Sequence, residues 1–204
     1  MIKAGIIGGT GYTGVELLRL LHNHDGVEVV AISSRSLDGK RVDSIFPSLV
    51  GHSNLVFSLP SDNILNTCDV IFFATPHGVA MEGAGAFIDK GIKVIDLGAD
   101  FRITDQTEWS KWYGMEHTQA ELLNSAVYGL PETNRAQVKD AMLLANPGCY
   151  PTAVQLALKP LITNKLISLS GIVADCKSGV SGAGRAANQA MLLCETSESL
   201  KSYG

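Results

Sequence analysis

The sequence is short of charged residues and of long apolar runs. Of its 204 residues, 18% are charged, against roughly 25% in an average soluble domain. No apolar run approaches the roughly 20 residues that a membrane-spanning helix needs, and the opening MIKAGIIGG leads into glycines rather than into a signal-peptide pattern. These absences argue against a membrane protein or a membrane partner and predict a cytoplasmic location.

Basic clusters and paired cysteines are missing too. The net charge is -4 with the two signs mixed, and there is no run of Lys and Arg of the kind that binds nucleic acid. The four cysteines, Cys68, Cys149, Cys176 and Cys194, are far apart and form no C-x-x-C pair, so neither a zinc site nor a disulfide framework is indicated. We therefore expect a small-molecule partner, no bound metal and one reactive thiol among buried ones.

What the sequence has instead is an alternation of short apolar runs with longer helical patterns. The apolar runs are continuous, which is typical of strands in a parallel sheet that helices cover on both faces. Strands are expected at 2–8, 27–33, 69–75, 92–98 and 141–146, and helices at 12–23, 62–67, 77–90 and 132–138. This order predicts an α/β fold, a Rossmann-type doubly wound parallel sheet, over residues 1–147.

Residues 148–204 have a different pattern. A helix that opens near Tyr150 is followed by one strand, a glycine loop and one helix in SLSGIVADCKSGVSGAGRAANQAMLLCE. The roughly 55 residues after Cys149 are too few to be comfortably stable alone. They either pack on the first domain or, as we expect, form the N-terminal part of an incomplete α+β substrate and dimerisation domain. Cys68, Cys176 and Cys194 lie inside apolar patterns and are assigned to packing.

The segment after the first expected strand, GGTGYTG, carries a dinucleotide-binding pattern. It satisfies G-x-G-x-x-G at Gly9, Gly11 and Gly14, follows a strand and opens an amphipathic helix. In that setting, glycines let the backbone approach a pyrophosphate, and the helix N-terminus offers free N–H groups. The alternative is an ordinary glycine-rich turn. The expected cofactor-binding residues here are Gly8, Thr10, Gly11, Tyr12, Thr13 and Gly14.

The end of the second strand indicates which dinucleotide is bound. An NAD site places Asp or Glu there to bind the ribose diol, whereas this chain has AISSRS. Ser34 and Arg35 offer a hydroxyl and a cation, so NADP is expected, unless Arg35 is only a solvated loop charge. Thr75 and Pro76, in ATPHGVA, lie where such folds place a loop over the cofactor. His77 beside them could simply cap a helix.

Cys149 lies in NPGCYPT, directly before a helical pattern with Pro151 in its first turn. It is therefore expected at a helix N-terminus on the carboxyl edge of the sheet, where open α/β folds bind ligands. That position favours the thiolate, which is the nucleophilic form. A thiolate beside a nicotinamide suggests acyl transfer to sulfur, followed by hydride delivery to the thioester.

Five segments, GGTGYTG, LGADFR, YGLPE, NPGCYPT and KSGVSGAGR, together resemble the N-acetyl-γ-glutamyl-phosphate reductases over essentially the whole chain. The resemblance implies NADP-dependent reduction of the acyl phosphate N-acetyl-γ-glutamyl phosphate to N-acetyl-glutamate 5-semialdehyde and phosphate, in arginine biosynthesis, with Cys149 as nucleophile. It also implies a homo-oligomer that associates through the second domain. Two alternatives stay open: an aspartate-semialdehyde dehydrogenase-type reductase and a non-catalytic NADP-binding module.

The same segments suggest further site residues. Arg102 in LGADFR has the planar fork that suits a substrate phosphate or carboxylate, although a structural ion pair is an equal alternative. KSGVSGAGR offers consecutive backbone N–H groups, unless it is a plain mobile loop; Ser178 and Gly179 are expected to bind substrate, and Ser181 and Gly182 the cofactor. The family's acid–base histidine lies in an HRH motif that this chain lacks, and none of its five histidines is assigned that role. We therefore expect the 204-residue chain to be severely impaired as an enzyme.

Overall fold

The computed structural model describes residues 1–203 and contains a seven-stranded sheet in which all neighbouring strands are parallel. The strands are β1 (Ile2–Ile7), β2 (Val27–Ser33), β3 (Phe57–Ser58), β4 (Val70–Phe73), β5 (Lys93–Asp96), β6 (Val127–Tyr128) and β7 (Leu143–Ala145). Their order across the sheet is β3-β2-β1-β4-β5-β7-β6, so the chain begins in the middle and winds outward in both directions. The predicted doubly wound parallel fold is confirmed.

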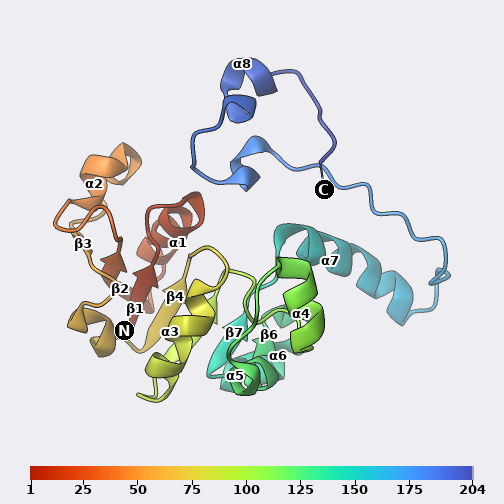
Figure 1. Ribbon diagram of the computed structural model, residues 1–204, viewed down its shortest axis with the longest axis horizontal. Helices are drawn as coiled ribbons and strands as arrows, with labels where there is room; N and C mark the ends of the chain where they lie inside the picture. The colour runs from red at the N-terminus through yellow and green to blue at the C-terminus, as the bar shows by residue number, and fades with distance from the viewer. Residues whose placement is uncertain (204) are drawn as a thin grey trace.

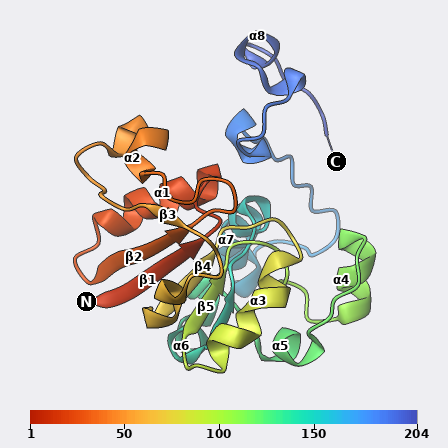
Figure 2. The same ribbon diagram turned by 60° about the vertical axis from the view of Figure 1, so that its left-hand side comes forward.

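Helices cover both faces of this sheet (Figures 1 and 2). Within β1, Ile6 packs in an apolar cluster with Leu18, whereas Ile7 packs in one with Met81 and Trp109. Because successive strand residues point to opposite faces, the first helix lies on one face and the third and fourth helices on the other. No helix within residues 1–203 is both long and apolar enough to cross a membrane. The helices are α1 (Tyr12–His22), α2 (Val42–Ile45), α3 (Val79–Ile88), α4 (Gln106–Tyr113), α5 (Ala120–Ser125), α6 (Pro131–Asp140), α7 (Cys149–Thr163) and α8 (Leu193–Thr196).

The structure changes several of the predicted boundaries. Strand β2 has its predicted range, and α1 ends one residue earlier than predicted. The helix predicted over 62–67 is a 3₁₀ helix, Asn63–Thr67. Strands β3 and β6 are two residues long, which is too short to leave an apolar run in the sequence. The sequence pattern also gives no prediction for α4 and α5.

Beyond α7 the chain leaves the sheet, as the blue segment in Figures 1 and 2 shows. Residues 164–203 contain two 3₁₀ turns and the short α8 but no strand, and all of them except Thr196 are exposed. The strand predicted here is therefore wrong, because a strand needs a neighbouring strand for its backbone hydrogen bonds. The assignment of Cys176 and Cys194 to packing is also wrong, since both are exposed, whereas Cys68 is buried.

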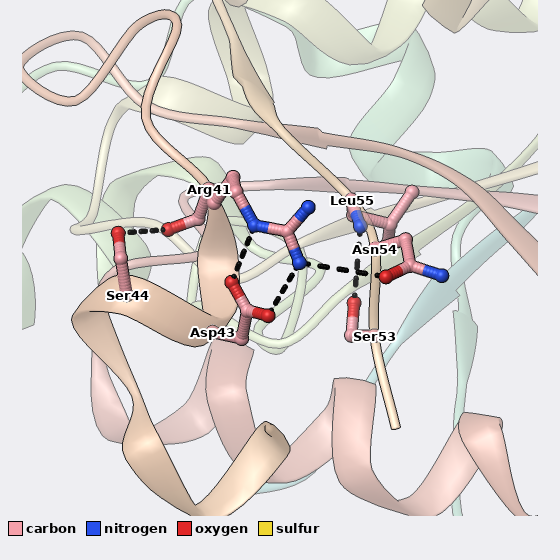
Figure 3. A network of polar contacts seen from close by, with 6 residues as sticks. All are labelled: Arg41, Asp43, Ser44, Ser53, Asn54 and Leu55. Atoms are coloured by element: carbon pink, nitrogen blue, oxygen red, sulfur yellow. Dashed lines mark hydrogen bonds and ion pairs between the residues drawn. The ribbon is translucent and has the colours of Figure 1, made fainter. Parts of the chain in front are cut away.

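A network of polar contacts stabilises the connection between β2 and β3 (Figure 3). The Arg41 guanidinium donates to the Asp43 carboxylate at 2.9 and 2.5 Å and to Asn54 Oδ1 at 3.4 Å. Beside it, the N–H of Val42 donates to the carbonyl of Leu55 at 2.9 Å. These contacts hold residues 41–43 against residues 54–55, directly before β3, which pairs with β2 in the sheet.

Candidate active site

The glycine loop between β1 and α1 is packed too closely to accept side chains at three of its positions, Gly8, Gly9 and Gly14. A Cβ on Gly9 would lie 2.3 Å from Cγ1 of the buried Ile32. Gly8 has a φ of +86°, and a Cβ there would lie 2.5 Å from the carbonyl oxygen of Ala74. A Cβ on Gly14 would lie 2.8 Å from the Cα of Gly9. A Cβ on Gly11, by contrast, would meet no atom within 4 Å. The loop is therefore tight on its protein side and open at Gly11, where a ligand can approach the backbone.

The N-terminus of α1 begins at this opening. Gly11 is the N-cap and has no side-chain acceptor, and the first helical hydrogen bond runs from the N–H of Val15 to Gly11 O at 3.1 Å. The N–H groups of Tyr12, Thr13 and Gly14 therefore have no acceptor inside the helix. Free N–H groups at the positive end of a helix dipole suit a pyrophosphate. The residues present fit the expected dinucleotide.

Ser34 and Arg35 follow β2 at the same edge of the sheet. Ser34 is buried, and its Oγ accepts hydrogen bonds at 3.2 Å from the N–H groups of Ser36 and Leu37, which shapes the turn. Arg35 is exposed. The hydroxyl of Ser33 is buried and has no hydrogen-bond partner among residues 1–203. Hydroxyls and one cation, without a carboxylate, make this turn compatible with a 2′-phosphate.

Thr75 lies against the glycine loop. Its Cγ2 is 2.9 Å from the position that a Gly8 Cβ would take, and its Oγ1 is buried without a hydrogen-bond partner in the described residues. Pro76 and His77 are exposed, and the His77 ring packs edge-on against an aromatic side chain of α4, with 5.0 Å between ring centroids. Gly78 is the N-cap of α3, so the alternative that His77 caps this helix is wrong.

Two buried carboxylates lie near the end of β5: Asp96 is its last residue, and Asp100 follows four residues later. Asp96 accepts hydrogen bonds from the N–H groups of Gly98 at 2.8 Å and Asp100 at 3.1 Å. Asp100 accepts from the N–H groups of Gly78 at 2.8 Å and Met81 at 2.9 Å. Burial, reinforced by the charge of Asp100, raises the pKa of Asp96 to about 7, although its two hydrogen bonds oppose this. The sequence pattern does not identify either residue; the available signal was an aspartate inside the expected strand 92–98 and a second one four residues further on.

Arg102 connects the segment after β5 to the cysteine. Its Nε donates to the carbonyl of Asn146 at 2.7 Å, and its Nη2 donates to the carbonyl of Leu97 at 3.0 Å. Its Nη1 is 3.2 Å from the position that a Gly148 Cβ would take. Within residues 1–203 Arg102 therefore holds backbone carbonyls and forms no ion pair. The alternative of a structural ion pair is not supported.

Cys149 is the first residue of α7 and is exposed. Gly148 before it is the N-cap and offers no side-chain acceptor, and the first helical hydrogen bond runs from the N–H of Thr152 to Gly148 O at 3.0 Å. Cys149 therefore belongs to the first turn of α7, whose N–H groups have no acceptor inside the helix. The predicted position at a helix N-terminus is confirmed.

Contacts continue along the carboxyl edge of the sheet from the glycine loop to Cys149. Thr75 touches Gly8 on one side, and on the other its carbonyl oxygen lies 3.4 Å from the Cβ position of Gly98. Arg102 then joins the segment after β5 to the segment that precedes Cys149. The glycine loop, Thr75 and Cys149 thus lie on one edge of β1, β4, β5 and β7. Within residues 1–203, no group of three or more His, Cys, Asp or Glu residues is placed to hold a metal ion.

The second glycine-rich segment approaches the first one through Arg185. Its Nη1 donates to the carbonyl of Thr10 at 3.2 Å, and its guanidinium lies 4.8 Å from the centre of the Phe46 ring. Ser181 lines the same pocket of about 210 Å³ as Tyr12, the first residue of α1. The sequence pattern gives Arg185 no role, although it ends the segment KSGVSGAGR. Three predicted residues of this segment, Ser178, Gly179 and Gly182, do not line the pocket.

Two family models match the chain. The model described as semialdehyde dehydrogenase, NAD binding domain, matches residues 3–141. The model described as semialdehyde dehydrogenase, dimerisation domain, matches residues 149–204. The first model alone covers more than half of the chain.

Curated relatives are similar over the whole chain. The N-acetyl-gamma-glutamyl-phosphate reductase of Vesicomyosocius okutanii subsp. Calyptogena okutanii (strain HA) is 62% identical over 203 residues, which are 100% of this chain and 60% of the relative. The protein of the same name from Acidithiobacillus ferrooxidans (strain ATCC 53993 / BNL-5-31) is 56% identical over 204 residues, which are 100% of this chain and 59% of the relative. The chain thus spans about 60% of the length of these relatives.

Solved structures share the fold at low sequence identity. Aspartate semialdehyde dehydrogenase II from Vibrio cholerae, complexed with ASA, has a TM-score of 0.60 at 19% identity over 80% of this chain and 47% of that chain. Aspartate semialdehyde dehydrogenase with NADP from Candida albicans has a TM-score of 0.59 at 18% identity, with the same coverage of 80% and 47%. With the matched domain models and a glycine loop and cysteine on one sheet edge, the chain belongs to the semialdehyde dehydrogenase family.

Proposed function

We propose that the protein containing this chain is an NADP-dependent reductase of N-acetyl-γ-glutamyl phosphate in arginine biosynthesis. Its products are N-acetyl-glutamate 5-semialdehyde and phosphate. Relatives of that name, at 56% and 62% identity, support the substrate. The observation that carries the chemistry is the exposed Cys149 at the N-terminus of α7, on the same sheet edge as the glycine loop.

Three segments of the chain are proposed to hold NADP. The glycine loop and the start of α1 bind the pyrophosphate, and Ser34 and Arg35 bind the 2′-phosphate. Thr75 and Pro76 line the nicotinamide half, which the partnerless hydroxyl of Thr75 supports. NADPH, when bound, supplies the hydride that reduces a thioester carbonyl. From the second part of the chain, Ser181 and Gly182 are proposed to complete the site.

Cys149 is proposed to carry the covalent step. Its thiolate attacks the acyl carbon, the bond from that carbon to the phosphate oxygen breaks, and phosphate leaves with the bonding electrons while a thioester forms. After reduction of the carbonyl, the carbon–sulfur bond breaks, the semialdehyde leaves and the thiolate is restored. Arg102, with Nη1 beside Gly148, is proposed to bind the substrate phosphate. Ser178 and Gly179 are proposed to bind the rest of the substrate.

The proposal includes a division of the chain into two parts. Residues 1–147 form the NADP-binding domain, and 148–204 form the N-terminal part of the catalytic and dimerisation domain. Family models that end at residue 141 and begin at residue 149 support this division. Strongly exposed apolar side chains in the second part, such as Val173 at 86% and Leu193 at 79%, support a homo-oligomer. A cytoplasmic location belongs to the same proposal.

The reaction is tested in the oxidative direction, by following phosphate-dependent reduction of NADP on the natural protein that contains this chain. N-acetyl-glutamate 5-semialdehyde is expected to be oxidised much faster than aspartate semialdehyde. Cys149→Ser is expected to lower the rate to background, whereas Cys176→Ser, at an exposed thiol outside any helix, is expected to leave it unchanged. Inactivity with both aldehydes would remove the reductase proposal, and a preference for aspartate semialdehyde would replace its substrate.

Thiol reactivity tests Cys149 in the 204-residue chain itself. Short treatment with iodoacetamide at neutral pH, followed by mass spectrometry of each cysteine peptide, gives the relative rates. Cys149 is expected to react several-fold faster than Cys176, because Cys149 begins a helix whose first N–H groups are free, whereas Cys176 lies outside any helix. Equal rates for these two exposed thiols would argue against an activated nucleophile.

A further inference from the structure

We propose that Asp100 is a positioning residue for the cofactor: its carboxylate caps α3 from outside that helix and so fixes the segment after β4 against the glycine loop. The inference rests on the proposed NADP-binding function. It extends that function by naming a buried residue that does not contact the cofactor itself but positions the segment proposed to hold the nicotinamide half.

The N-terminus of α3 lacks a cap of its own. Its N-cap is Gly78, which has no side chain, and the third helical residue is Met81, which has no side-chain acceptor for the N-cap N–H. In a capping box, side chains at these two positions satisfy each other's backbone N–H groups. Here the Asp100 carboxylate accepts hydrogen bonds from both N–H groups, one oxygen from Gly78 N at 2.8 Å and the other from Met81 N at 2.9 Å.

Glycine at position 78 explains why the cap comes from a different segment. Gly78 has a φ of +90°, a conformation that side chains with a Cβ rarely adopt. A Ser, Thr or Asp cap at this position would be strained. The sharp turn after β4 therefore excludes a local cap, and the buried carboxylate of Asp100 replaces it.

Asp100 is itself held in place by the side chains around it. Its N–H donates to Asp96 Oδ2 at 3.1 Å, and its carbonyl lies 2.8 Å from Nε2 of the buried His117. Because the Nδ1 of His117 accepts from the N–H of Gln119 at 3.2 Å, the proton is assigned to Nε2, which donates to Asp100. Trp109 Nε1 donates to the adjacent carbonyl at 2.9 Å. The carboxylate therefore has little freedom to follow a displaced helix.

The segment that Asp100 fixes faces the nicotinamide half of the proposed site. Ser34 and Arg35 follow β2, so the adenosine half lies on the β2 side of β1. β4 is the neighbour of β1 on the other side, so the segment after β4 would hold the nicotinamide half of the proposed NADP. Thr75, three residues before Gly78, lies against the glycine loop with a buried hydroxyl that has no partner among residues 1–203. Loss of the cap is expected to move this segment and leave the adenosine half in place.

Two ligands separate the halves of the site experimentally. Dissociation constants for NADPH and for 2′,5′-ADP, which carries only the adenosine half, are measured by calorimetry on the natural protein that contains this chain and on its Asp100→Asn variant. Asn keeps one acceptor and turns the other into a donor that faces an N–H group. The Kd for NADPH is expected to rise about 10-fold, as for the loss of a hydrogen bond to a charged group, while the Kd for 2′,5′-ADP is unchanged.

Lys93→Met is the matched control, because it removes two hydrogen bonds at the other end of β5. Lys93 Nζ donates to the carbonyls of Lys139 and Ala141, each at 3.1 Å. This variant is expected to lower the melting temperature, as Asp100→Asn does, without changing either Kd. A rise in the NADPH Kd of Lys93→Met would mean that loss of stability alone weakens binding, which overturns the inference.

The remaining outcomes keep the two proposals apart. If the unmodified protein binds neither ligand, the proposed function fails and this inference fails with it. If Asp100→Asn changes both Kd values equally, or neither, only the positioning role is overturned. Should this variant not fold, hydrogen exchange by NMR on the unmodified chain decides, because the amides of Gly78 and Met81 are expected to be protected. Free exchange at both amides overturns the cap.

Discussion

At the scale of single residues, the two glycines Gly8 and Gly11 differ in what surrounds them. Gly8 has backbone packed against it and a positive φ, so the fold requires a residue without a Cβ. Gly11 has an extended backbone with a φ of -80° and open space where a Cβ would point. The first glycine is needed by the chain itself, whereas the second leaves the backbone open to the proposed NADP.

Gly8→Ala is expected to destabilise the protein. The left-handed backbone costs a residue with a Cβ about 1–3 kcal/mol, and the contact with the Ala74 carbonyl adds to this, since a backbone atom has little freedom to move. We expect the free energy of unfolding in urea to fall by about 2 kcal/mol or more. An unchanged midpoint and slope of the urea transition would contradict the packing described for this loop.

Gly11→Ala is expected to leave stability nearly unchanged and to weaken cofactor binding. Alanine is a poorer N-cap than glycine but lowers the entropy of the unfolded chain, so the net change in unfolding free energy is within about 1 kcal/mol. The added methyl group occupies the space proposed for the pyrophosphate. Overpacking of this kind costs about 1–3 kcal/mol, so the Kd for NADPH is expected to rise about 10-fold or more in calorimetry. Equal destabilisation by both glycine variants would contradict the distinction between them.

At the scale of elements, the end of β5 carries the buried polar groups that connect its neighbours. Asp96 ties its own turn, Asp100 caps α3, and Arg102 holds the segment before α7. Side chains at the end of β5 and just after it therefore hold three segments in position: the turn after β5, the start of α3 and the segment before α7. A carboxylate buried there is unfavourable when it is charged, which gives this element a dependence on pH.

Stability is expected to fall as the pH rises from about 4 to about 7 because of Asp96. Its pKa is about 7 in the folded protein, against the ordinary value of 3.8. Between these values the folded state keeps a proton that the unfolded state releases, so stability is lost as the pH rises and levels off above the folded pKa. Urea unfolding at pH 4.5 to 8 measures this, and Asp96→Asn is expected to flatten the profile by a few kcal/mol at most.

Asp43 provides a control, because its pKa is shifted in the opposite direction to that of Asp96. The guanidinium of Arg41 holds the pKa of the Asp43 carboxyl below its ordinary value (Figure 3). Its contribution to stability is therefore present at neutral pH and is lost only as the pH falls below the ordinary value. Asp43→Asn is expected to leave the slope between pH 4.5 and 8 as it is. A similar slope in Asp96→Asn and the unmodified chain would contradict the role given to Asp96.

At the scale of the whole molecule, the chain consists of a first part with a buried apolar core and a second part whose residues are largely exposed. Among residues 1–203, the buried apolar core extends from Ala4 to Ala145. Helix α7 has no buried residue, and the described chain after it is exposed except at Thr196, with apolar side chains such as Leu169 at 72% and Leu200 at 79%. An exposed apolar surface of this kind marks a surface that other protein covers, which agrees with the proposed self-association.

Trypsin is expected to cut the chain first after α7. The backbone there makes few hydrogen bonds, so cleavage after Lys177 or Arg185 needs no opening of the core, whereas cleavage after Lys111 requires α4 to unfold locally. Mass spectrometry over time, at low and high protein concentration, measures the order of cutting. Protection of Lys177 is expected to grow with concentration if a second copy covers this surface. Simultaneous cutting at Lys111 and Lys177 in dilute protein would contradict the division by burial.

The sequence predicts the elements whose residues carry their own pattern. Strand β2 and helix α1 have nearly their predicted bounds because apolar periodicity and glycine spacing are local properties. Cys149 is found at a helix start because Asn-Pro-Gly ends one segment and Pro151 suits the first turn of the next. The strand predicted after α7 fails, since an apolar run forms a strand only beside a partner.

What the sequence by itself determined is the alternation of the longer strands and helices up to α7, the glycine loop and the position of the thiol at a helix start. Only the tertiary structure decided that Asp100 caps α3, that Arg102 binds carbonyls instead of a carboxylate, and that Arg185 reaches Thr10 from 175 residues away. The physical reason is that backbone preferences act between neighbours in the chain. A buried hydrogen bond depends on which distant groups the parallel sheet brings to the same edge.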